Sequence, residues 1–586
     1  MLVAVKNIGE ILEKSNQRIE DATEGKILIL NINTSSNDFK ITIEDYNPNK
    51  INSYLFKKRS SKGNTSVPFV PIGENQKSFN NIQKSFDKIR RWISKAVKEI
   101  EKDTSKIEKA LQILTKKKTK ILKELWDKLS EYSKKEIKFI TFKINGKYPG
   151  DIVVLQEFYK QNAEQKVLKT STKNKTCSIC GEIKDEVSAR TFVYQFDTDD
   201  KPGFISEFNK KNFWKNIPVC KECRKYLETS RKFIDTNLKF QFAARLSYQI
   251  IPDVLVKDLS LLEKVLHILK DTKKNVSLSD RVVRRITEDE NDILYLLKDF
   301  DNRISFNLLF MESSNSAERI LLNVEEVLPS RLKEIFDAKE IVDSLFNNER
   351  EYEKFTFGKI RNFFSTTDTE KKDYDLDRYF LEIVDAVFKD KKLSFPFLTK
   401  FFMNIISKKF MAISDNDETS DWKFRNAVKD AMMCVSFFEN LKLINFKEEA
   451  MEGSIFDAIF NKYGKSLNTP EKRGIFLLGA LTQMLLQVQY NTRGSKPFLK
   501  KLKNLKMDEA DIKSLLPEIH NKFEEYDAFD KGKKLIAQEI SNYLLSAGDN
   551  WKMSVDEINY YFACGMSLAN DVKNIVYNKD EGKGDE

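Results

Sequence analysis

The sequence contains two short cysteine motifs of the same form, Cys177-Ser-Ile-Cys180-Gly and Cys220-Lys-Glu-Cys223. Each C-x-x-C motif can hold two thiolates on one side of a tight turn, and two such pairs complete the tetrahedral sulfur shell that zinc prefers. We therefore predict a zinc site with Cys177, Cys180, Cys220 and Cys223 as its ligands. Because a shell of four thiolates leaves no position for water or substrate, we expect the metal to be structural.

Two other interpretations of these motifs remain open, namely two unrelated turns or a redox-active pair. A redox pair would not account for the second motif, and the βαβ pattern of thioredoxin-like proteins is absent around both. The other cysteines singled out, Cys434 and Cys564, lie in apolar stretches with helical spacing. Because a free cysteine in such a stretch behaves as a small hydrophobe, we expect both in the core.

Residues for catalysis are scarce, since the chain of 586 residues has only two histidines. Neither His267 nor His520 has a serine, cysteine or second histidine at a catalytic spacing. Asp197, Asp199 and Asp200 could together bind a divalent cation, although their neighbours are typical of a turn. The phosphate-binding glycine motifs and the H-E-x-x-H motif are also absent from the sequence. The residues that usually carry nucleotide hydrolysis and zinc-dependent hydrolysis are therefore missing from this sequence.

Basic residues slightly outnumber acidic ones, with 100 Lys and Arg against 89 Asp and Glu. This small excess argues against binding a polyanion over the whole surface, so any nucleic-acid contact must be local. Two clusters are the candidate nucleic-acid-binding residues: Arg59, Lys62 and Asn64 in a basic loop, and Arg493, Lys496 and Lys500 in and after a Gly-Ser turn. A solvated surface or a protein interface is the alternative for each cluster.

The elements that must position these residues follow from hydrophobic periodicity. Apolar runs and alternation predict adjacent strands at residues 26–32 and 39–43, and a further strand at 137–144 that ends at an Asn145-Gly146 turn. Between residues 78 and 135 the spacing of apolar residues predicts two helices. After the cysteine motifs, helices are expected at residues 257–270 and 279–298.

The predicted fold class is α+β and mostly helical, with a four-cysteine zinc-binding segment inserted after a mixed N-terminal region and a helical bundle at the C-terminal end. The predicted domains are an N-terminal α+β region at 1–165, a zinc-binding segment at 166–235, an α+β continuation at 236–370 with a hairpin near 303–324, and a helical bundle at 371–586.

Composition also bears on location. The sequence has six cysteines, no apolar leader behind Met1 and no apolar run of about eighteen residues. The longest apolar stretch, at 474–490, is interrupted by polar residues and is typical of a buried helix in a soluble protein. We therefore expect a cytoplasmic protein with reduced thiols and no role in a membrane.

A series of short motifs follows one another along the chain: Cys177 to Gly181, Thr198 to Phe204, Trp214 to Cys223, Phe233-Ile234, Tyr248 to Pro252, Glu326 to Ser330, Phe355 to Arg361, Gly474 to Gly479, Arg493 to Phe498 and Tyr561 to Met566. In its motifs and their order, the sequence resembles the large subunit of type I-B CRISPR surveillance complexes, known as Cascade. The resemblance spans most of the chain, and the first 150 residues contribute little to it.

The resemblance implies a non-catalytic subunit that recognises the protospacer-adjacent motif in target double-stranded DNA and stabilises the displaced strand. Its implied partners are the crRNA-bound Cascade backbone and small subunits, and a helicase-nuclease recruited in trans for antiviral defence. Residues from about 451 to 586 then resemble a small subunit made from an internal start. Met451 is the candidate start, and Met432 and Met433 are the alternatives.

Two other functions remain open. One is a zinc-containing nucleic-acid enzyme related to the type III large subunit, although the paired Gly-Gly-Asp-Asp motifs and the His-Asp motif of that family are absent. The other is a zinc-stapled helical scaffold that binds only protein. The resemblance does not indicate which residues read the adjacent motif.

Overall fold

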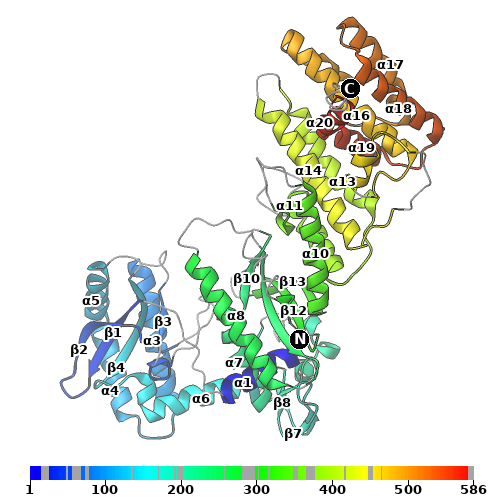
Figure 1. Cartoon of the computed structure of the whole chain (residues 1–586). Coiled ribbons are helices and arrows are strands. Elements are labelled where there is room, and N and C mark those ends of the chain that lie inside the picture. Colours follow the sequence, from blue (N-terminus) through cyan, green and yellow to red (C-terminus); the bar gives the residue numbers. More distant parts are fainter. Residues whose placement is uncertain are drawn as a thin grey trace. The chain divides into compact units, whose positions relative to one another are not determined.

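The computed structural model confirms a mostly helical α+β fold (Figure 1). The chain divides into two compact units. The first unit is Met1–Thr236 with Glu312–Ile320, and the second is Asn237–Met311 with Leu321–Glu586. The structure describes residues 1–14, 25–47, 50–55, 67–72, 78–132, 136–168, 170–189, 193–194, 202–243, 246–256, 258–279, 297–300, 302–314, 317–346, 354–364, 376–414, 418–446, 453–463 and 465–577.

A four-stranded sheet forms the centre of the first unit. Its strands are β1 (Lys26–Asn33), β2 (Asp38–Asp45), β3 (Val70–Pro71) and β4 (Ile137–Ile144), in the order β2-β1-β4-β3. β1 and β4 are parallel, and the two outer pairings are antiparallel. The three strands predicted from the sequence are confirmed. The turn after β4 is confirmed as well, with φ angles of 49° at Asn145 and 79° at Gly146.

Three helices, and not the two expected, lie between residues 78 and 135: α3 (Phe79–Glu99), α4 (Ser105–Lys116) and α5 (Lys118–Ser130). The break falls at Lys117, where φ is −101° and ψ is 17°. The apolar spacing continues across this break, because Leu114 and Ile121 face the same hydrophobic core. The sequence pattern therefore does not reveal the break.

The sheet is covered differently on its two faces. One face packs on α3, α4 and α5 through a large cluster of buried residues that includes Leu30, Ile89 and Phe142. The other face carries a smaller, aromatic-rich cluster that includes Tyr54 and Tyr148. Three further helices lie near this sheet: α2 (Ile51–Tyr54), η3 (Pro149–Asp151) and α6 (Val153–Leu168). The first helix, α1 (Leu2–Lys14), packs instead on α7 (Lys221–Asn237), where the Ser230 hydroxyl donates to the Val5 carbonyl.

The second unit begins with another four-stranded sheet, made of β10 (Lys239–Phe242), β11 (Leu246–Val254), β12 (Ile304–Ser314) and β13 (Ala317–Val327) in that order. β12 and β13 are neighbours in the sheet and lie where the sequence pattern predicts a hairpin. The helix α8 (Leu259–Ser279) follows β11. The helix expected at 279–298 falls largely outside the described residues.

The rest of the second unit is helical, as expected. Its elements are α10 (Pro329–Phe346), α11 (Phe357–Asn362), α12 (Asp377–Phe388), α13 (Phe395–Met411), α14 (Glu418–Asn440), α15 (Asp457–Lys462), α16 (Pro470–Arg493), η7 (Pro497–Leu502), α17 (Glu509–Glu525), α18 (Lys531–Ala547), α19 (Val555–Ser567) and α20 (Ala569–Tyr577).

The helix α16 is buried along most of its length, as its apolar sequence predicts. Its buried polar side chains are hydrogen-bonded. The Thr482 hydroxyl donates to the Leu478 carbonyl at 2.7 Å, and Gln489 Oε1 accepts from the Phe498 backbone N–H at 3.1 Å. These bonds explain how polar residues can interrupt an apolar stretch and still be buried.

The backbones of α16 and α19 touch at two glycines. A Cβ atom added at Gly479 would lie 2.1 Å from the carbonyl oxygen of Phe562, and one added at Gly565 would lie 1.8 Å from that of Phe476. Both distances are far below van der Waals contact. The crossing therefore requires glycine on both helices.

We predict that Gly479→Ala destabilises the protein by about 3 kcal/mol or more, because the new methyl group must push α19 away from α16. Urea denaturation measures this change. Gly453→Ala is the control, since its Cβ would lie 3.6 Å from Asp457 Oδ2, which is ordinary contact. Equal midpoints for the two variants would contradict the tight crossing.

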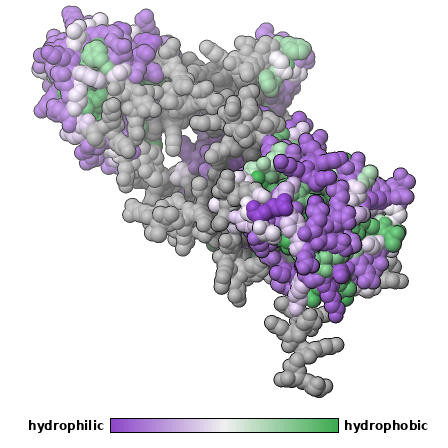
Figure 2. All heavy atoms as spheres, turned by 90° about the horizontal axis from the view of Figure 1, so that it is seen from above, coloured by the Kyte–Doolittle hydropathy of each residue, from purple (hydrophilic) through white to green (hydrophobic). Residues whose placement is uncertain are grey.

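The surface in Figure 2 is dominated by hydrophilic side chains, and hydrophobic ones appear there as small separate patches. Among the described residues, no helix is both long enough and apolar enough to cross a membrane.

Candidate metal centre and basic turn

The first cysteine motif is a turn between two short strands. β6 (Lys175–Thr176) and β7 (Ile183–Lys184) pair antiparallel and bring the ends of the motif together. Within the turn, the Gly181 N–H donates to the Cys177 carbonyl at 2.9 Å. Gly181 has a φ of 75°, which favours glycine over other residues. This turn places Cys177 and Cys180 side by side.

The second motif lies where a strand leads into a helix. Cys220 ends β9 (Val219–Cys220), and Cys223 lies in the first turn of α7 (Lys221–Asn237). β9 pairs with β8 (Val187–Ser188), which in turn pairs with β5 (Ser171–Thr172). Ser178 joins the two motifs, because its N–H and its hydroxyl donate to the Pro218 carbonyl at 2.8 Å and 3.0 Å.

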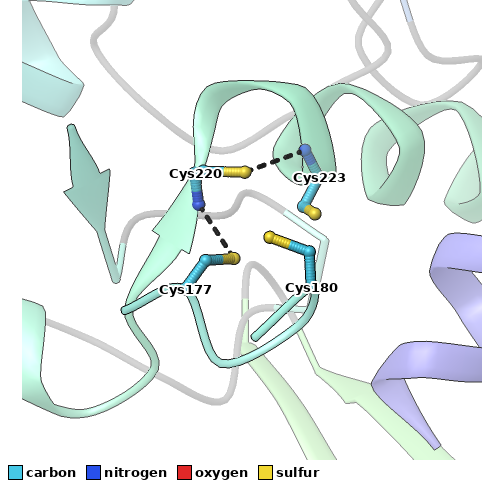
Figure 3. A group of neighbouring side chains, drawn as sticks. All are labelled: Cys177, Cys180, Cys220 and Cys223. Atoms are coloured by element: carbon cyan, nitrogen blue, oxygen red, sulfur yellow. Dashed lines mark hydrogen bonds between the residues drawn. The ribbon is translucent and has the colours of Figure 1, made fainter. Parts of the chain in front are cut away.

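The four cysteines that the sequence predicts as ligands come together, and their sulfur atoms lie within 4.8 Å of one another (Figure 3). Zinc–sulfur bonds of about 2.3 Å in a tetrahedron place the sulfur atoms roughly 3.8 Å apart, so only a small contraction is needed. Cys180 is exposed and the other three are buried. The four cysteines can therefore hold a metal ion, and their donor set fits a tetrahedral, sulfur-preferring metal.

Burial and hydrogen bonding act in opposite directions on these thiols. Burial raises the pKa of Cys220 and of Cys223, which favours their neutral forms. Burial acts in the same direction on Cys177, but backbone N–H groups of Cys180, Cys220 and Ile179 outweigh it and lower its pKa to about 7. The Cys220 N–H donates to Cys177 Sγ at 3.3 Å. A bound metal ion must therefore displace protons from the buried thiols.

We predict that Cys177→Ser and Cys220→Ser each abolish stoichiometric metal binding, because each removes one of four thiolate ligands from a closed shell. Inductively coupled plasma mass spectrometry of the purified proteins measures the metal content. Cys434→Ser is the control, since Cys434 is also buried but lies outside the cluster. A wild-type protein without stoichiometric metal, or a Cys177→Ser variant that keeps it, would contradict the assignment.

The basic turn after α16 places its predicted residues in different environments. Arg493 ends α16 and is exposed, and its guanidinium lies 5.1 Å from the centre of the Tyr526 ring. Lys500 is exposed in η7. The side chain of Lys496 is only 8% exposed and forms an ion pair with Asp421 of α14. The charges of Arg493 and Lys500 thus reach solvent, whereas that of Lys496 is used within the fold.

Other candidates from the sequence are placed as follows. Cys434 and Cys564 are free and buried, as predicted. His520 Nε2 lies 3.1 Å from Glu524 Oε1, and its ring packs on Phe529. The cluster of Arg59, Lys62 and Asn64, and the three aspartates at 197, 199 and 200, lie outside the described residues.

The sequence pattern did not reveal the residues that fix α7 in place. Arg231 of α7 binds Glu318 of β13, with 2.6 Å between Nη2 and Oε1, and also Asp235 at 2.8 Å. Its guanidinium also packs over the Tyr194 ring. Because Glu318 is distant in the sequence, no local pattern could have indicated this ion pair.

The sequence matches models of CRISPR-associated proteins along most of its length. The chain belongs to the family of the CRISPR-associated protein TM1802 (cas_TM1802), whose N-terminal, central and C-terminal domains match residues 1–162, 174–327 and 355–580. No curated protein matches the chain. The cysteine cluster lies in the central domain, and the basic turn lies in the C-terminal domain. The CRISPR association expected from the sequence is thereby confirmed.

Proposed function

We propose that this chain is the non-catalytic large subunit of a type I-B CRISPR surveillance complex. The match of all three cas_TM1802 domains carries the proposal, because it assigns the whole chain to CRISPR function. In such a complex, pairing with the guide RNA reads the target sequence, and the protein reads a short adjacent motif in the duplex. The crRNA-bound backbone and small subunits, the target DNA and a recruited helicase-nuclease are then its partners.

The metal in this proposal is zinc, with a structural role. Zinc prefers four thiolates in a tetrahedron, and the cluster offers four sulfur atoms from two rigid turns. Four thiolates fill the shell and leave no position for a substrate. The closed donor set, the shortage of histidines and the contact between His520 and Glu524 support a non-catalytic subunit.

We assign binding of the displaced DNA strand to the turn after α16. Arg493 and Lys500 are exposed there, and cationic side chains bind the phosphates of single strands without reading their sequence. Lys496 holds the turn against α14 through its ion pair with Asp421. In this proposal Lys496 therefore positions its neighbours and does not itself bind DNA.

We assign recognition of the protospacer-adjacent motif to Arg59, Lys62 and Asn64, which the sequence predicts to lie in a loop. Arginine, lysine and asparagine side chains are the usual hydrogen-bonding partners of base edges and phosphates. The sequence of this loop also contains Gly63 and several serines, which allow close approach of the backbone to DNA.

The chain from about residue 451, with Met451 or the earlier Met432 or Met433 as its start, is proposed to serve also as a separate small subunit.

We predict that the double variant Arg493→Glu and Lys500→Glu weakens target binding by the assembled complex. The slope of the logarithm of the binding constant against the logarithm of the salt concentration should fall in magnitude by about 1.4, because each lost contact to a single-strand phosphate contributes about 0.7. Fluorescence anisotropy at several salt concentrations measures both. Lys552→Glu with Lys573→Glu is the matched control, since both lysines are exposed on the same bundle.

An unchanged affinity and slope in the double variant would overturn the assignment of the turn. The function itself has separate tests. An intact complex that ignores target duplex, or a purified chain that turns over nucleotide or cleaves nucleic acid, would contradict a non-catalytic DNA-binding subunit.

A further inference from the structure

The face of the first sheet opposite α3, α4 and α5 is polar at one end. Side chains alternate along a strand, and Leu30 and Ile32 of β1 face the helices, so Asn31 and Asn33 face the other way. Asn145, in the turn after β4, bonds to Thr34 in the turn between β1 and β2: its Oδ1 accepts from the Thr34 N–H at 2.9 Å, and its Nδ2 donates to Thr34 Oγ1 at 2.8 Å. In the strand register, Asn31 lies opposite Lys40 of β2. Amide and ammonium groups thus gather on this face.

A cavity of about 320 Å³ opens at this end of the sheet. Its lining includes Asn31, Asn33, Lys40 and Asn145, together with the backbone of the Asn145-Gly146 turn. β1 and β4 run parallel, and both end at this cavity. Pockets of about 300 Å³ and more are large enough for small organic ligands.

Two asparagines of the cavity, Asn31 and Asn33, keep hydrogen-bonding capacity for a ligand. Asn31 uses Nδ2 to donate to Thr42 Oγ1 at 2.6 Å, which leaves its Oδ1 as an acceptor. Asn33 Oδ1 accepts from the N–H groups of Ser35 and Ser36 at 2.9 Å and 3.1 Å, which leaves the two Nδ2 hydrogens as donors. The cavity therefore offers donors and acceptors side by side.

The charge at the cavity is positive. Lys40 is exposed and forms no ion pair with any residue that the structure describes. The carboxylate of Asp38 at the cavity rim is bound by Lys117, with 2.8 Å between Nζ and Oδ1. Because this acid is already neutralised, Lys40 provides the uncompensated charge. A ligand with both an anionic group and a hydrogen-bonding edge fits these features.

We infer that this cavity binds one unpaired nucleotide of a nucleic-acid strand. The asparagine amides match the mixed donors and acceptors of a base edge, and Lys40 binds the adjoining phosphate. A free phosphate alone would use the lysine but not the amides. The inference rests on the proposed function, since that function supplies the RNA and DNA, but it concerns a site distant in sequence from the basic turn.

Photo-crosslinking of the full chain tests the inference. The probes are single-stranded RNA and DNA oligonucleotides of the same sequence with 5-iodouracil bases, and mass spectrometry identifies the crosslinked peptides. We expect crosslinks in residues 26–45 or 137–150. A preference for one probe would show whether the strand is ribose or deoxyribose.

Two variants keep the fold while changing the cavity. Asn33→Asp retains the Oδ1 that accepts from Ser35 and Ser36 but replaces the donors with an anionic oxygen. Lys40→Glu reverses an exposed charge. We expect each to reduce crosslinking at these peptides and to weaken oligonucleotide binding about tenfold. Lys123→Glu is the matched control, because Lys123 is an exposed lysine of α5, on the helical face of the sheet.

The outcomes separate this inference from the proposed function. Crosslinks confined to residues near Arg493, or full crosslinking in Asn33→Asp and Lys40→Glu, would overturn the nucleotide cavity and leave the DNA-binding subunit intact. Crosslinks at the cavity that persist in the Arg493→Glu and Lys500→Glu variant would support the cavity as an independent site.

Discussion

The C-terminal bundle depends on direct backbone contact between α16 and α19. Two glycines, Gly479 and Gly565, allow this contact, and nothing larger fits at either position. With α19 this close, α16 is buried along most of its length, and its neighbours α17, α18 and α20 pack around it. The end of α16 is therefore fixed by the core of the bundle. The exposed cations after it start from a fixed support. In the proposed function, this support lowers the entropy lost on binding a strand.

The cysteine segment has a small hydrophobic cluster among the residues that the structure describes. Its strands are two residues long, and its hydrophobic cluster is formed by Ala189, Ile205 and Phe213. A cluster of this size contributes little to folding compared with the cost in chain entropy. A metal ion held by two turns can make up this difference. The ion binds only the folded site, so its binding free energy adds to the free energy of folding. The segment thus resembles small metal-stabilised domains, in which the ligands replace a core.

Much of the fold could be predicted from the sequence, because the signals were local. An apolar run indicated β1 and alternating residues indicated β2, the Asn145-Gly146 pair indicated a turn, and the cysteine spacing indicated the cluster. The break at Lys117 was missed because the apolar pattern continues through it. The pairing of Lys496 with Asp421, and of Arg231 with Glu318, joins residues far apart in the chain. Such pairs follow from tertiary packing, and composition alone does not indicate them.

The first compact unit is discontinuous in sequence, since Glu312–Ile320 belongs with Met1–Thr236. A protease or a gene truncation that ends the chain at residue 236 would remove Glu318, and the mostly buried Arg231 would lose one of its two carboxylate partners. No single cut can therefore release this unit intact. Any fragment that contains the whole of this unit must therefore extend at least to Ile320.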